Sequence, residues 1–422
     1  MRILVLTINY WPEQTGIGAV LTHRCEYLAS QGHEVTVCTA MPYYPEWRIH
    51  PGYNRKLFFR EERNGVNVLR SWLWVPKKVT SAKRVAFETS FLASSLLRAI
   101  QNPKPDLLLV ASPPLGLGIS AVALSRWWRI PYVFDVQDLQ PDAAADLQML
   151  PGSVLPMLYR METMAYRNAA LVSTVTGGMR NKIIEKGIAA GKVVVVPPIA
   201  DSSLFDVGTL IGGDEFRRKH DLEGKFVVGH CGNMGVKQGL DLVLDAALQL
   251  RELRDVIFLL AGDGAKKSCL EQRASALGLD NVRFLPLQDT SAFLQMLAAM
   301  DVGLIVQQST VSDIVFPSKT VALLSAARPV IAAVNEESEI ARVIQNSRGG
   351  VVTEPEAPQA FAAAAQELLS DSGKRFAMGE YGRQYALQHW EKNRVLSAFE
   401  NHLIDTTHPA DDDAIAEVSI SA

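Results

Sequence analysis

The segment FVVGHCGNMGVKQGLDLVLDAAL, residues 226–248, carries the clearest structural pattern in this 422-residue sequence. Its first residues, Phe226, Val227 and Val228, form an apolar run typical of a buried strand, and the leucines and alanines after Gly239 recur at helical spacing. Four glycines punctuate the segment: Gly229, Gly232, Gly235 and Gly239. The pattern predicts a strand, a glycine-rich loop and a helix, which together form the repeating unit of a parallel α/β sheet.

The glycine-rich loop has the features of a phosphate-binding turn. Backbone N–H groups and the positive end of the helix dipole converge where a strand passes through glycines into a helix, and Lys237 adds a full charge. Val236 separates Gly235 from Lys237, so the loop is not a Walker A motif, and its glycines lack the spacing of a dinucleotide fingerprint. On its own, the loop is equally compatible with a tight turn that binds nothing.

The same alternation of apolar strands and amphipathic helices recurs along the chain. We expect strands at residues 2–7, 34–38, 107–111, 132–136, 171–174, 193–196, 256–261, 283–286 and 302–306. A chain of this length exceeds one ordinary hydrophobic core. The Pro197–Pro198 pair places a boundary near Ala200, so residues 1–200 and 201–385 are expected to form two α/β domains with parallel sheets. Residues 386–406 are expected to form a helix, and the polar, acidic residues 407–422 a disordered tail.

Composition and cysteine spacing exclude several classes of protein. Hydrophobic residues make up 48% of the chain and charged residues 21%, which is typical of a globular protein. The four cysteines are scattered without a C-x-x-C pair, which argues against a zinc site or a disulfide framework. The first residues lead directly into a strand, and no run of 18 apolar residues occurs, so we expect a cytoplasmic protein without a membrane-spanning segment.

One segment is strongly basic, although the chain as a whole has a net charge of −3. Residues 53–104 contain 11 Lys or Arg and 3 Glu, a balance of +8, together with Trp72, Trp74 and an apolar helical pattern over residues 79–100. An amphipathic helix of this kind can lie against an anionic membrane surface. The alternative is a solvated face over a helix packed on the core. No motif for nucleic acid is present, so no nucleic-acid partner is expected.

Three carboxylates, Asp135, Asp138 and Asp142, stand at or beyond the end of the strand expected at 132–136. Ligand-binding groups of open α/β sheets gather at this edge. Neither a histidine nor a further carboxylate follows at ligand spacing, so we do not expect a metal site.

A second candidate anion site lies in DIVFPSKTVALL, residues 313–324. Pro317 suits the start of a helix, whose first amides would belong to Ser318, Lys319 and Thr320. Two helix N-termini, together with Lys237 and Lys319, suit a diphosphate and would stabilise its charge as it leaves, without a metal ion.

These motifs resemble those of the GT-B glycosyltransferases of family four. Pro12 followed by Gly16 and Gly18, the sequence GHEV at 32–35, the K-Q-G loop and FPSK at 316–319 carry the resemblance. It implies two Rossmann-like, doubly wound parallel-sheet domains facing across a cleft, with a final helix that returns to the N-terminal domain. It also implies sugar transfer from a nucleotide-diphosphate sugar with retention of anomeric configuration and no cofactor, the departing phosphate taking the acceptor's proton.

The resemblance assigns roles by position. Catalysis is expected from Asp138, Lys237 and Lys319. The donor-binding residues that it implies are Gly16, Gly18, Gly232, Asn233, Gln238, Gly262, Asp263, Leu285, Asp313, Pro317, Ser318 and Thr320. The acceptor-binding residues that it implies are Gln137 and Asp142.

Two of these segments depart from the family pattern. Gln137 stands where the family has His or Arg, which leaves Asp138 as the polar candidate beside the acceptor. The two family glutamates, the second of which holds the donor ribose, are replaced by Ile314 and Ala322, so Asp313 is the expected sugar-side carboxylate.

The loop GNMGVKQGL, with Asn233 in place of a common arginine, is similar to the colanic acid biosynthesis branch of this family. That branch implies transfer in exopolysaccharide assembly, with fucose as an expected sugar, an undecaprenyl-diphosphate-linked saccharide as acceptor, and contact with the inner face of the membrane. Two other functions fit the same architecture. One is a non-hydrolysing nucleotide-sugar epimerase, and the other is a non-catalytic sugar-binding protein, which usually carries a signal peptide.

Overall fold

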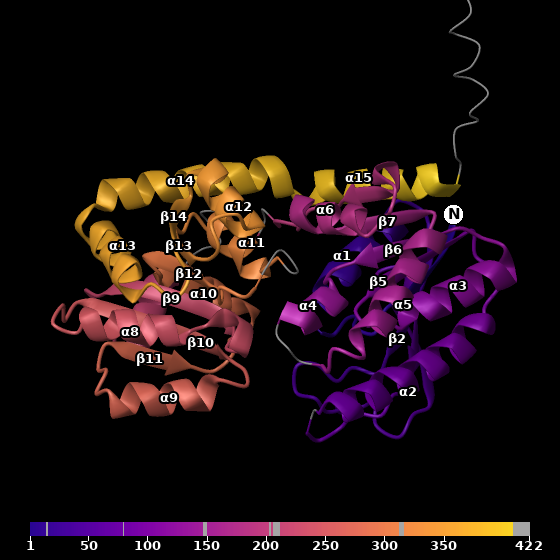
Figure 1. The fold of residues 1–422 in the computed structure, drawn as a ribbon, viewed down its shortest axis with the longest axis horizontal. Helices are drawn as coiled ribbons and strands as arrows, with labels where there is room; N and C mark the ends of the chain where they lie inside the picture. The colour runs from indigo at the N-terminus through magenta and orange to yellow at the C-terminus, as the bar shows by residue number, and fades with distance from the viewer. Residues whose placement is uncertain are drawn as a thin grey trace, which may run out of the picture. The chain divides into compact units, whose positions relative to one another are not determined.

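The computed structural model describes residues 1–13, 16–78, 80–146, 150–201, 204–205, 212–311 and 316–407. The chain divides into two compact units. The first contains Met1–Val196 and the chain from Asn393 onward, and the second contains Pro197–Lys392. Each unit has its own parallel-type sheet covered by helices, as Figure 1 shows. The segment expected to be a disordered tail lies outside the described residues from 408 onward.

The sheet of the first unit has eight strands in the order β3-β4-β2-β1-β5-β6-β7-β8. Strand β3 pairs with β4 in antiparallel fashion, and the other neighbours are parallel. The strands are β1 (Arg2–Leu6), β2 (Glu34–Ala40), β3 (Phe58–Arg63), β4 (Val66–Ser71), β5 (Leu107–Ser112), β6 (Tyr132–Val136), β7 (Leu171–Thr174) and β8 (Val193–Val195). The central strands are mostly apolar because both of their faces are buried, with Arg2, Ser112 and Asp135 as the polar residues of β1, β5 and β6.

Helices follow most of these strands. They are α1 (Ile17–Ser30), α2 (Ser81–Ile100), α3 (Leu117–Trp128), α4 (Gln140–Asp146), α5 (Leu155–Asn168), α6 (Gly177–Glu185) and the short 3-10 helix η1 (Ala190–Lys192). The last helix, α15 (Lys392–Thr407), belongs to this unit as well, and in Figure 1 it lies beside the chain's N-terminus. Its buried face consists of Val395, Leu396, Phe399 and Leu403, at helical spacing.

The sheet of the second unit has six parallel strands in the order β11-β10-β9-β12-β13-β14. They are β9 (Phe226–Asn233), β10 (Val256–Asp263), β11 (Val282–Leu285), β12 (Val302–Val306), β13 (Val330–Ala333) and β14 (Gly350–Thr353). Separate hydrophobic clusters on opposite-facing residues of β9, around Val228 and around Val227, form its core. A doubly wound α/β unit has this construction.

The helices of the second unit alternate with these strands along the chain. They are α7 (Gly213–Lys219), the 3-10 helix η2 (Val236–Gln238), α8 (Asp241–Gln249), α9 (Lys267–Ala276), α10 (Thr290–Ala299), α11 (Ser318–Ser325), α12 (Glu339–Ser347), α13 (Pro358–Ser370) and α14 (Ser372–Trp390). None of the helices in the described part of the chain combines the length and apolar composition that a bilayer crossing requires.

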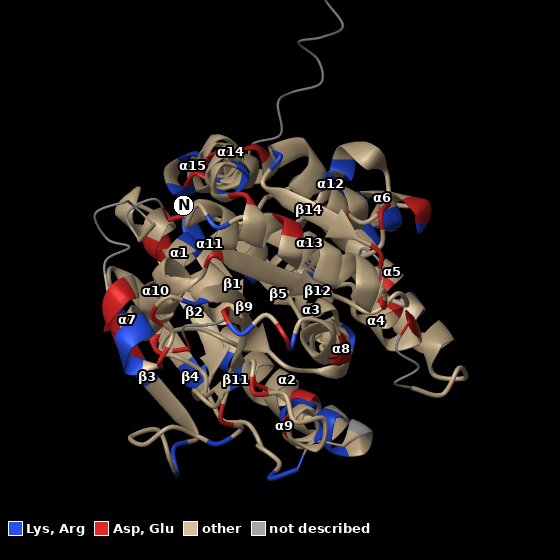
Figure 2. Ribbon diagram, turned by 90° about the vertical axis from the view of Figure 1, so that its left-hand side faces the viewer, with Lys and Arg blue, Asp and Glu red and all other residues tan. Residues whose placement is uncertain are grey.

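The β3–β4 hairpin was not predicted from the sequence. Its strands carry charged residues, and β3 alternates exposed and half-buried positions instead of forming an apolar run. A tight turn at Asn64 and Gly65, both with positive φ, joins the two strands, and such an Asn-Gly pair is a known hairpin signal. Figure 2 shows the contrast: the central strands β1, β5 and β12 are almost free of the charged residues that colour the helices and loops.

A buried ion pair crosses the core of the first unit. Arg24 on α1 contacts Asp135 on β6 at 2.8 Å, and both side chains are almost completely buried. Asp135 also accepts hydrogen bonds from Ser173 on β7 at 2.8 Å and from Gln137 at 2.6 Å. The Arg24 guanidinium lies 4.5 Å from the ring centre of Phe399 on α15. One network therefore joins α1, the sheet and the returning helix, and gives Asp135 a structural partner.

Replacing Arg24 by Ala is expected to lower the free energy of unfolding of the first unit by about 3–5 kcal/mol, because it leaves the Asp135 carboxylate buried without its counter-charge. Urea unfolding followed by tryptophan fluorescence measures this, since six of the seven tryptophans lie in the first unit. Arg2→Ala, which removes an exposed ion pair with Asp106 in the same unit, is the matched control and should cost about 0.5 kcal/mol or less. Equal losses in the two variants would contradict the structural role of the buried pair.

Candidate functional site

The carboxyl ends of β9 and β10 meet at two glycines. Gly232 pairs with Gly262 and Asn233 pairs with Asp263 at the last positions of the two strands. A Cβ atom built on Gly262 would lie 1.8 Å from the Gly232 carbonyl oxygen, so the backbones approach too closely for a side chain. The loops after both strands are also joined, because the Lys266 amide donates to the Met234 carbonyl at 2.9 Å. These loops form one continuous backbone surface at the edge where α/β sheets bind ligands.

The glycine-rich loop forms a 3-10 turn before the helix begins. Gln238 closes this turn, its Oε1 accepting from the Gly235 amide at 3.1 Å. The Gln308 amide, just after β12, donates to the Lys237 carbonyl at 3.0 Å and ties the turn to the next strand. The structure therefore gives Gln238 a part in shaping the loop, and it places Lys237 on a turn anchored from two sides.

The start of α8 differs from the sequence-based expectation. The amides of Leu242 and Val243 are already bonded to the carbonyls of Gly239 and Leu240. Asp241 occupies the first helical turn and pairs with Arg273 at 2.9 Å. The expectation that this helix N-terminus offers bare amides to an anion is wrong, because the 3-10 turn separates the glycines from the helix and a carboxylate occupies its first turn. The amides and charge available to an anion belong to the turn itself.

The segment around α11 brings Lys319 to the same edge. Pro317 is the N-cap of α11, Ser318 is exposed, and Lys319 is partly buried. The Lys319 Nζ lies 3.2 Å from Nδ1 of His230 on β9. Thr320 is buried, and its amide donates to the Pro317 carbonyl at 3.0 Å, so it points into the core and not toward the loop surface. Asp313 lies outside the described residues.

Burial shifts the pKa values of two side chains at this edge, Lys319 and His230. Loss of solvent lowers the pKa of Lys319 to about 8, with the nearby Cys231 thiol acting in the opposite direction. Burial and the Lys319 charge together lower the pKa of His230 well below its usual value, so the imidazole is neutral at physiological pH. Among the described residues no carboxylate pairs with Lys237 or Lys319. Two cations at one sheet edge that have no counter-charge within the described ranges favour an anionic ligand.

Leu285 and the G-D-G turn occupy the next position along the edge. Lys267 on α9 donates from its Nζ to the carbonyls of Gly262 at 3.0 Å and of Leu285 at 3.3 Å. Asp263 accepts from the Gly264 amide at 2.8 Å and is exposed at the end of β10. Lys267 was not identified from the sequence, where it is one of two adjacent lysines after the G-D-G turn. It holds the ends of β10 and β11 together.

In the first unit, a buried carboxylate lies beside the start of α1, where Gly16 is the N-cap and Gly18 belongs to the first turn. Glu13 accepts from the backbone amides of Tyr43 and Tyr44, each at 2.9 Å, and from Asn9 at 2.7 Å. A Cβ atom on Gly18 would lie 2.8 Å from the Glu13 carbonyl oxygen, so α1 begins in close contact with this loop. Burial raises the pKa of Glu13, while the hydrogen bonds from Tyr43, Tyr44 and Asn9 lower it. Glu13 therefore shapes the loop beside the two glycines.

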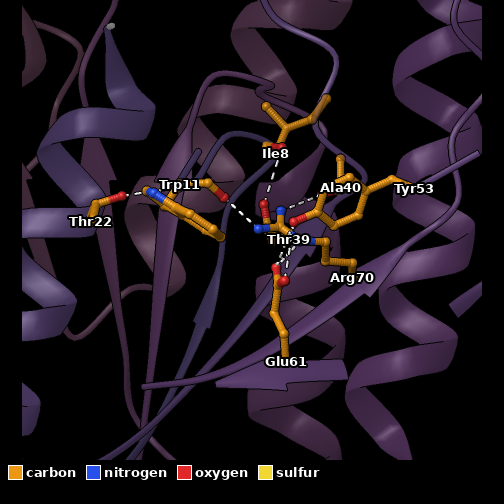
Figure 3. Close-up of polar contacts among 8 residues, drawn as sticks. All are labelled: Ile8, Trp11, Thr22, Thr39, Ala40, Tyr53, Glu61 and Arg70. Atoms are coloured by element: carbon orange, nitrogen blue, oxygen red, sulfur yellow. Dashed lines mark hydrogen bonds and ion pairs between the residues drawn. The ribbon is translucent and has the colours of Figure 1, made fainter. Parts of the chain in front are cut away.

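Arg70 at the end of β4 holds the same loop from the other side (Figure 3). Its fully buried guanidinium donates to the carbonyl of Trp11 and to that of Ala40. Glu61 on β3 supplies the counter-charge, and the Tyr53 ring lies 5.0 Å from the guanidinium. Neither Glu13 nor Arg70 was identified from the sequence, although a charge inside an apolar strand such as VNVLRS is a signal for a buried ion pair.

The residues expected beside an acceptor lie at the carboxyl end of β6. Gln137 donates to Asp135 at 2.6 Å and is held by the network around Arg24. Asp142 on α4 pairs with Lys186, which also contacts the buried Glu162 at 2.7 Å. Asp138 is partly buried and has polar partners of its own. The structure thus places Gln137, Asp138 and Asp142 at one edge, with Gln137 and Asp142 engaged in contacts that position α4.

Family models match both halves of the chain. Residues 15–198 match a model described as a glycosyl transferase 4-like domain, and residues 213–385 match one described as glycosyl transferases group 1. A protein named as a colanic acid biosynthesis glycosyl transferase, WcaI of Escherichia coli K12, is 34% identical over 412 residues. The alignment covers 96% of this chain and 100% of that protein.

Solved structures show the same fold. Sucrose-phosphate synthase from Thermosynechococcus elongatus superimposes with a TM-score of 0.78 at 16% identity, covering 97% of this chain and 100% of that one. HepE of Anabaena, solved in complex with UDP-glucose, gives 0.73 at 19% identity, covering 96% and 100%. The prediction of a GT-B fold, with two parallel-sheet α/β domains, is confirmed.

Replacing Gly262 by Ala is expected to lower the free energy of unfolding of the second unit by about 2–4 kcal/mol, because the new methyl group would meet the Gly232 carbonyl and the residue has a positive φ of 148°. Chemical denaturation followed by circular dichroism measures the loss. Gly278→Ala is the control, since Gly278 also has a positive φ but open space around it, and should cost about 1 kcal/mol. If both variants lose the same amount, the close approach of β9 and β10 does not constrain this position.

Proposed function

Because this chain belongs to the group 1 glycosyl transferases, with a glycosyl transferase 4-like first half, we propose that the edge of its second sheet binds a nucleotide-diphosphate sugar. The chain is a glycosyltransferase. The observation that carries the donor proposal is the pair Lys237 and Lys319, neither of which has a carboxylate partner within the described residues. They lie on two segments that the hydrogen bonds of Gln308 and His230 tie to the same sheet edge.

The proposed roles follow from charge. The diphosphate lies against the turn at 235–239, with Lys237 and Lys319 as its counter-charges and Gly232, Asn233 and the Ser318 amide around it. Gly262, Asp263 and Leu285 line the nucleotide end of the site. Preorganised cations of this kind stabilise a departing oxyanion more than they stabilise the bound donor, because the leaving group gains charge in the transition state.

We propose retention of configuration at the transferred sugar. The bond between the sugar's anomeric carbon and the phosphate oxygen breaks, and a bond from the same carbon to the acceptor hydroxyl oxygen forms on the same face. The hydroxyl proton passes to the departing phosphate oxygen, which leaves as the nucleoside diphosphate. Asp138, at the edge of the first sheet, is proposed to orient the acceptor hydroxyl, and Gly16 and Gly18 allow close approach of the backbone.

The identity of the donor is tested by melting temperature. A ligand that binds the folded state raises the melting temperature in proportion to the logarithm of its concentration over its dissociation constant. A panel of UDP-, GDP- and ADP-sugars, including GDP-fucose, identifies the base. Fucose is proposed because of the 34% identity to the colanic acid biosynthesis relative.

The product's anomeric configuration, measured by NMR, tests retention. Epimerised donor in the absence of acceptor would instead indicate an epimerase.

Replacing Lys237 or Lys319 by Ala is expected to lower kcat/KM for the donor found in that panel by a factor equivalent to about 2–4 kcal/mol, because each change removes a cation that faces the leaving diphosphate. Release of nucleoside diphosphate in the presence of acceptor measures it. Lys225→Ala is the control. Lys225 immediately precedes the same strand, β9, at its opposite end, and pairs with Asp255 on the surface. Unchanged turnover in both Lys237→Ala and Lys319→Ala would remove the basis of the donor site.

The acceptor is proposed to be a lipid-linked saccharide presented at an anionic membrane surface. Trp72 and Trp74 are each about two-fifths exposed, and Val85 on α2 is exposed as well. The hydroxyls of Ser90 and Ser94 on α2 bond the backbone of the two tryptophans, so this segment lies along α2. Four exposed cations are close to these apolar residues in the sequence: Lys77, Lys78, Lys83 and Arg84. Exposed aromatic residues accompanied by cations suit the interface of an anionic bilayer.

Replacing Lys77, Lys78, Lys83 and Arg84 together by Ser is expected to weaken binding to vesicles containing phosphatidylglycerol by about a hundredfold or more, since each cation near such a surface contributes about 1 kcal/mol. Co-sedimentation measures it. The control removes four exposed cations from the second unit, Arg218, Lys219, Arg251 and Arg254. Equal loss in the two variants would point to net charge alone, and equal transfer to a lipid-free acceptor would argue against a lipid-linked substrate.

A further inference from the structure

His230 lies inside the second sheet directly beneath the proposed diphosphate site. It is completely buried on β9, between the apolar Val228 and the end of the strand at Asn233. Both ring nitrogens nevertheless have polar partners. Nδ1 lies 3.2 Å from Lys319 Nζ, and Nε2 lies 3.2 Å from the Asn233 carbonyl oxygen. One partner belongs to α11 and the other to the end of β9, so the ring bridges two elements at this edge.

The chemistry of the partners determines the tautomer of the ring. An ammonium group has three donors and no acceptor, so Nδ1 must accept the hydrogen bond from Lys319. A carbonyl oxygen only accepts, so Nε2 must carry the ring hydrogen and donate it to Asn233. The pKa of His230 is well below its usual value, because of burial and the Lys319 charge, and this keeps the ring in that neutral form.

We propose that His230 is a positioning residue, which fixes the Lys319 ammonium against the glycine-rich loop by bonding Lys319 and the Asn233 carbonyl at the same time. The proposal rests on the donor site described above and extends it to a residue that does not touch the donor. The ring uses one of the three hydrogens of the ammonium and leaves the others for phosphate oxygens. It also holds the Asn233 carbonyl, so the amides that follow in the loop keep their direction.

His230 also determines how the site responds to pH. The titratable groups described around Lys319 Nζ are the His230 ring and the thiol of Cys231, both on β9. Burial raises the pKa of Cys231 to about 11, so the thiol is neutral through the physiological range. With the pKa of Lys319 at about 8, diphosphate binding is expected to weaken as pH rises above 8, because the free site must then take up a proton. The Nδ1 lone pair stabilises the ammonium, so its removal moves this pH limit downward.

Two substitutions separate this role from simple packing. His230→Asn keeps an acceptor oxygen near the position of Nδ1, whereas His230→Leu keeps the volume but offers Lys319 no acceptor. The dissociation constants of UDP and GDP are measured by calorimetry from pH 7 to pH 9 for the wild-type chain and both variants. If loss of the acceptor lowers the pKa of Lys319 by about one unit, His230→Leu binds within about twofold of wild type at pH 7 and about tenfold more weakly at pH 9. His230→Asn follows the wild-type profile.

The outcomes are distinguishable. Binding of neither UDP nor GDP by the wild-type chain would contradict the donor site itself. Wild-type binding with the same pH limit in His230→Leu, or with a loss in that variant that is uniform across pH, would overturn the positioning role. A further measurement needs no variant protein to bind ligand: nitrogen-15 chemical shifts of the wild-type histidines, with His230 assigned from the signal missing in His230→Asn. They are expected to show hydrogen on Nε2, and hydrogen on Nδ1 would overturn the proposal.

Discussion

Burying an ammonium group without a carboxylate partner is unfavourable in free energy, and Lys319 in the second unit is such a group within the described residues. The neutral imidazole of His230 offsets part of this cost. His230 contacts Lys319 through Nδ1 and the Asn233 carbonyl through Nε2, and no carboxylate in the described part of the chain pairs with this ammonium. A carboxylate in the same place would form a stable ion pair and compete with phosphate. Burial lowers the pKa of Lys319, and an anion bound beside the ammonium would raise this pKa again.

In the first unit, by contrast, buried cations pair with carboxylates. Arg70 pairs with Glu61, Arg24 pairs with Asp135, and Lys186 pairs with both Asp142 and Glu162. Further hydrogen bonds accompany two of these pairs: Asp135 also accepts from Ser173 and Gln137, and Arg70 also donates to the carbonyls of Trp11 and Ala40. Such additional bonds help buried charges to hold segments in place. The carboxylates of these pairs lie on strands β3 and β6 and on helices α4 and α5. The buried charges of this unit therefore hold its elements together, whereas Lys237 and Lys319 have no carboxylate partner among the described residues.

Backbone contacts also join the loops at the edge of the second sheet. Gly262 has no room for a side chain against Gly232, and the Lys237 carbonyl is held by the Gln308 amide. The loops after β9, β10 and β12 therefore form a connected surface, with Lys267 tying in the end of β11. A surface that is preorganised in this way binds an anion without paying to order the loops at the moment of binding.

The sequence by itself determined the strands and helices whose period is unambiguous, the two α/β domains, and the segments that carry Lys237 and Lys319. Apolar runs such as LLLVAS and VGLIV, and glycines placed between a strand and a helix, are local patterns, and local patterns follow from hydrophobic periodicity. Only the tertiary structure decided which charges are paired. The pairs Arg24–Asp135 and Lys319–His230 join residues 111 and 89 positions apart, and no spacing rule connects such residues. The structure was also needed to show that a carboxylate occupies the first turn of α8, that Glu13 and Arg70 hold one loop, and that Gln137 and Asp142 have polar partners. Whether a polar group is buried, and what it pairs with, depends on the residues that the fold brings next to it.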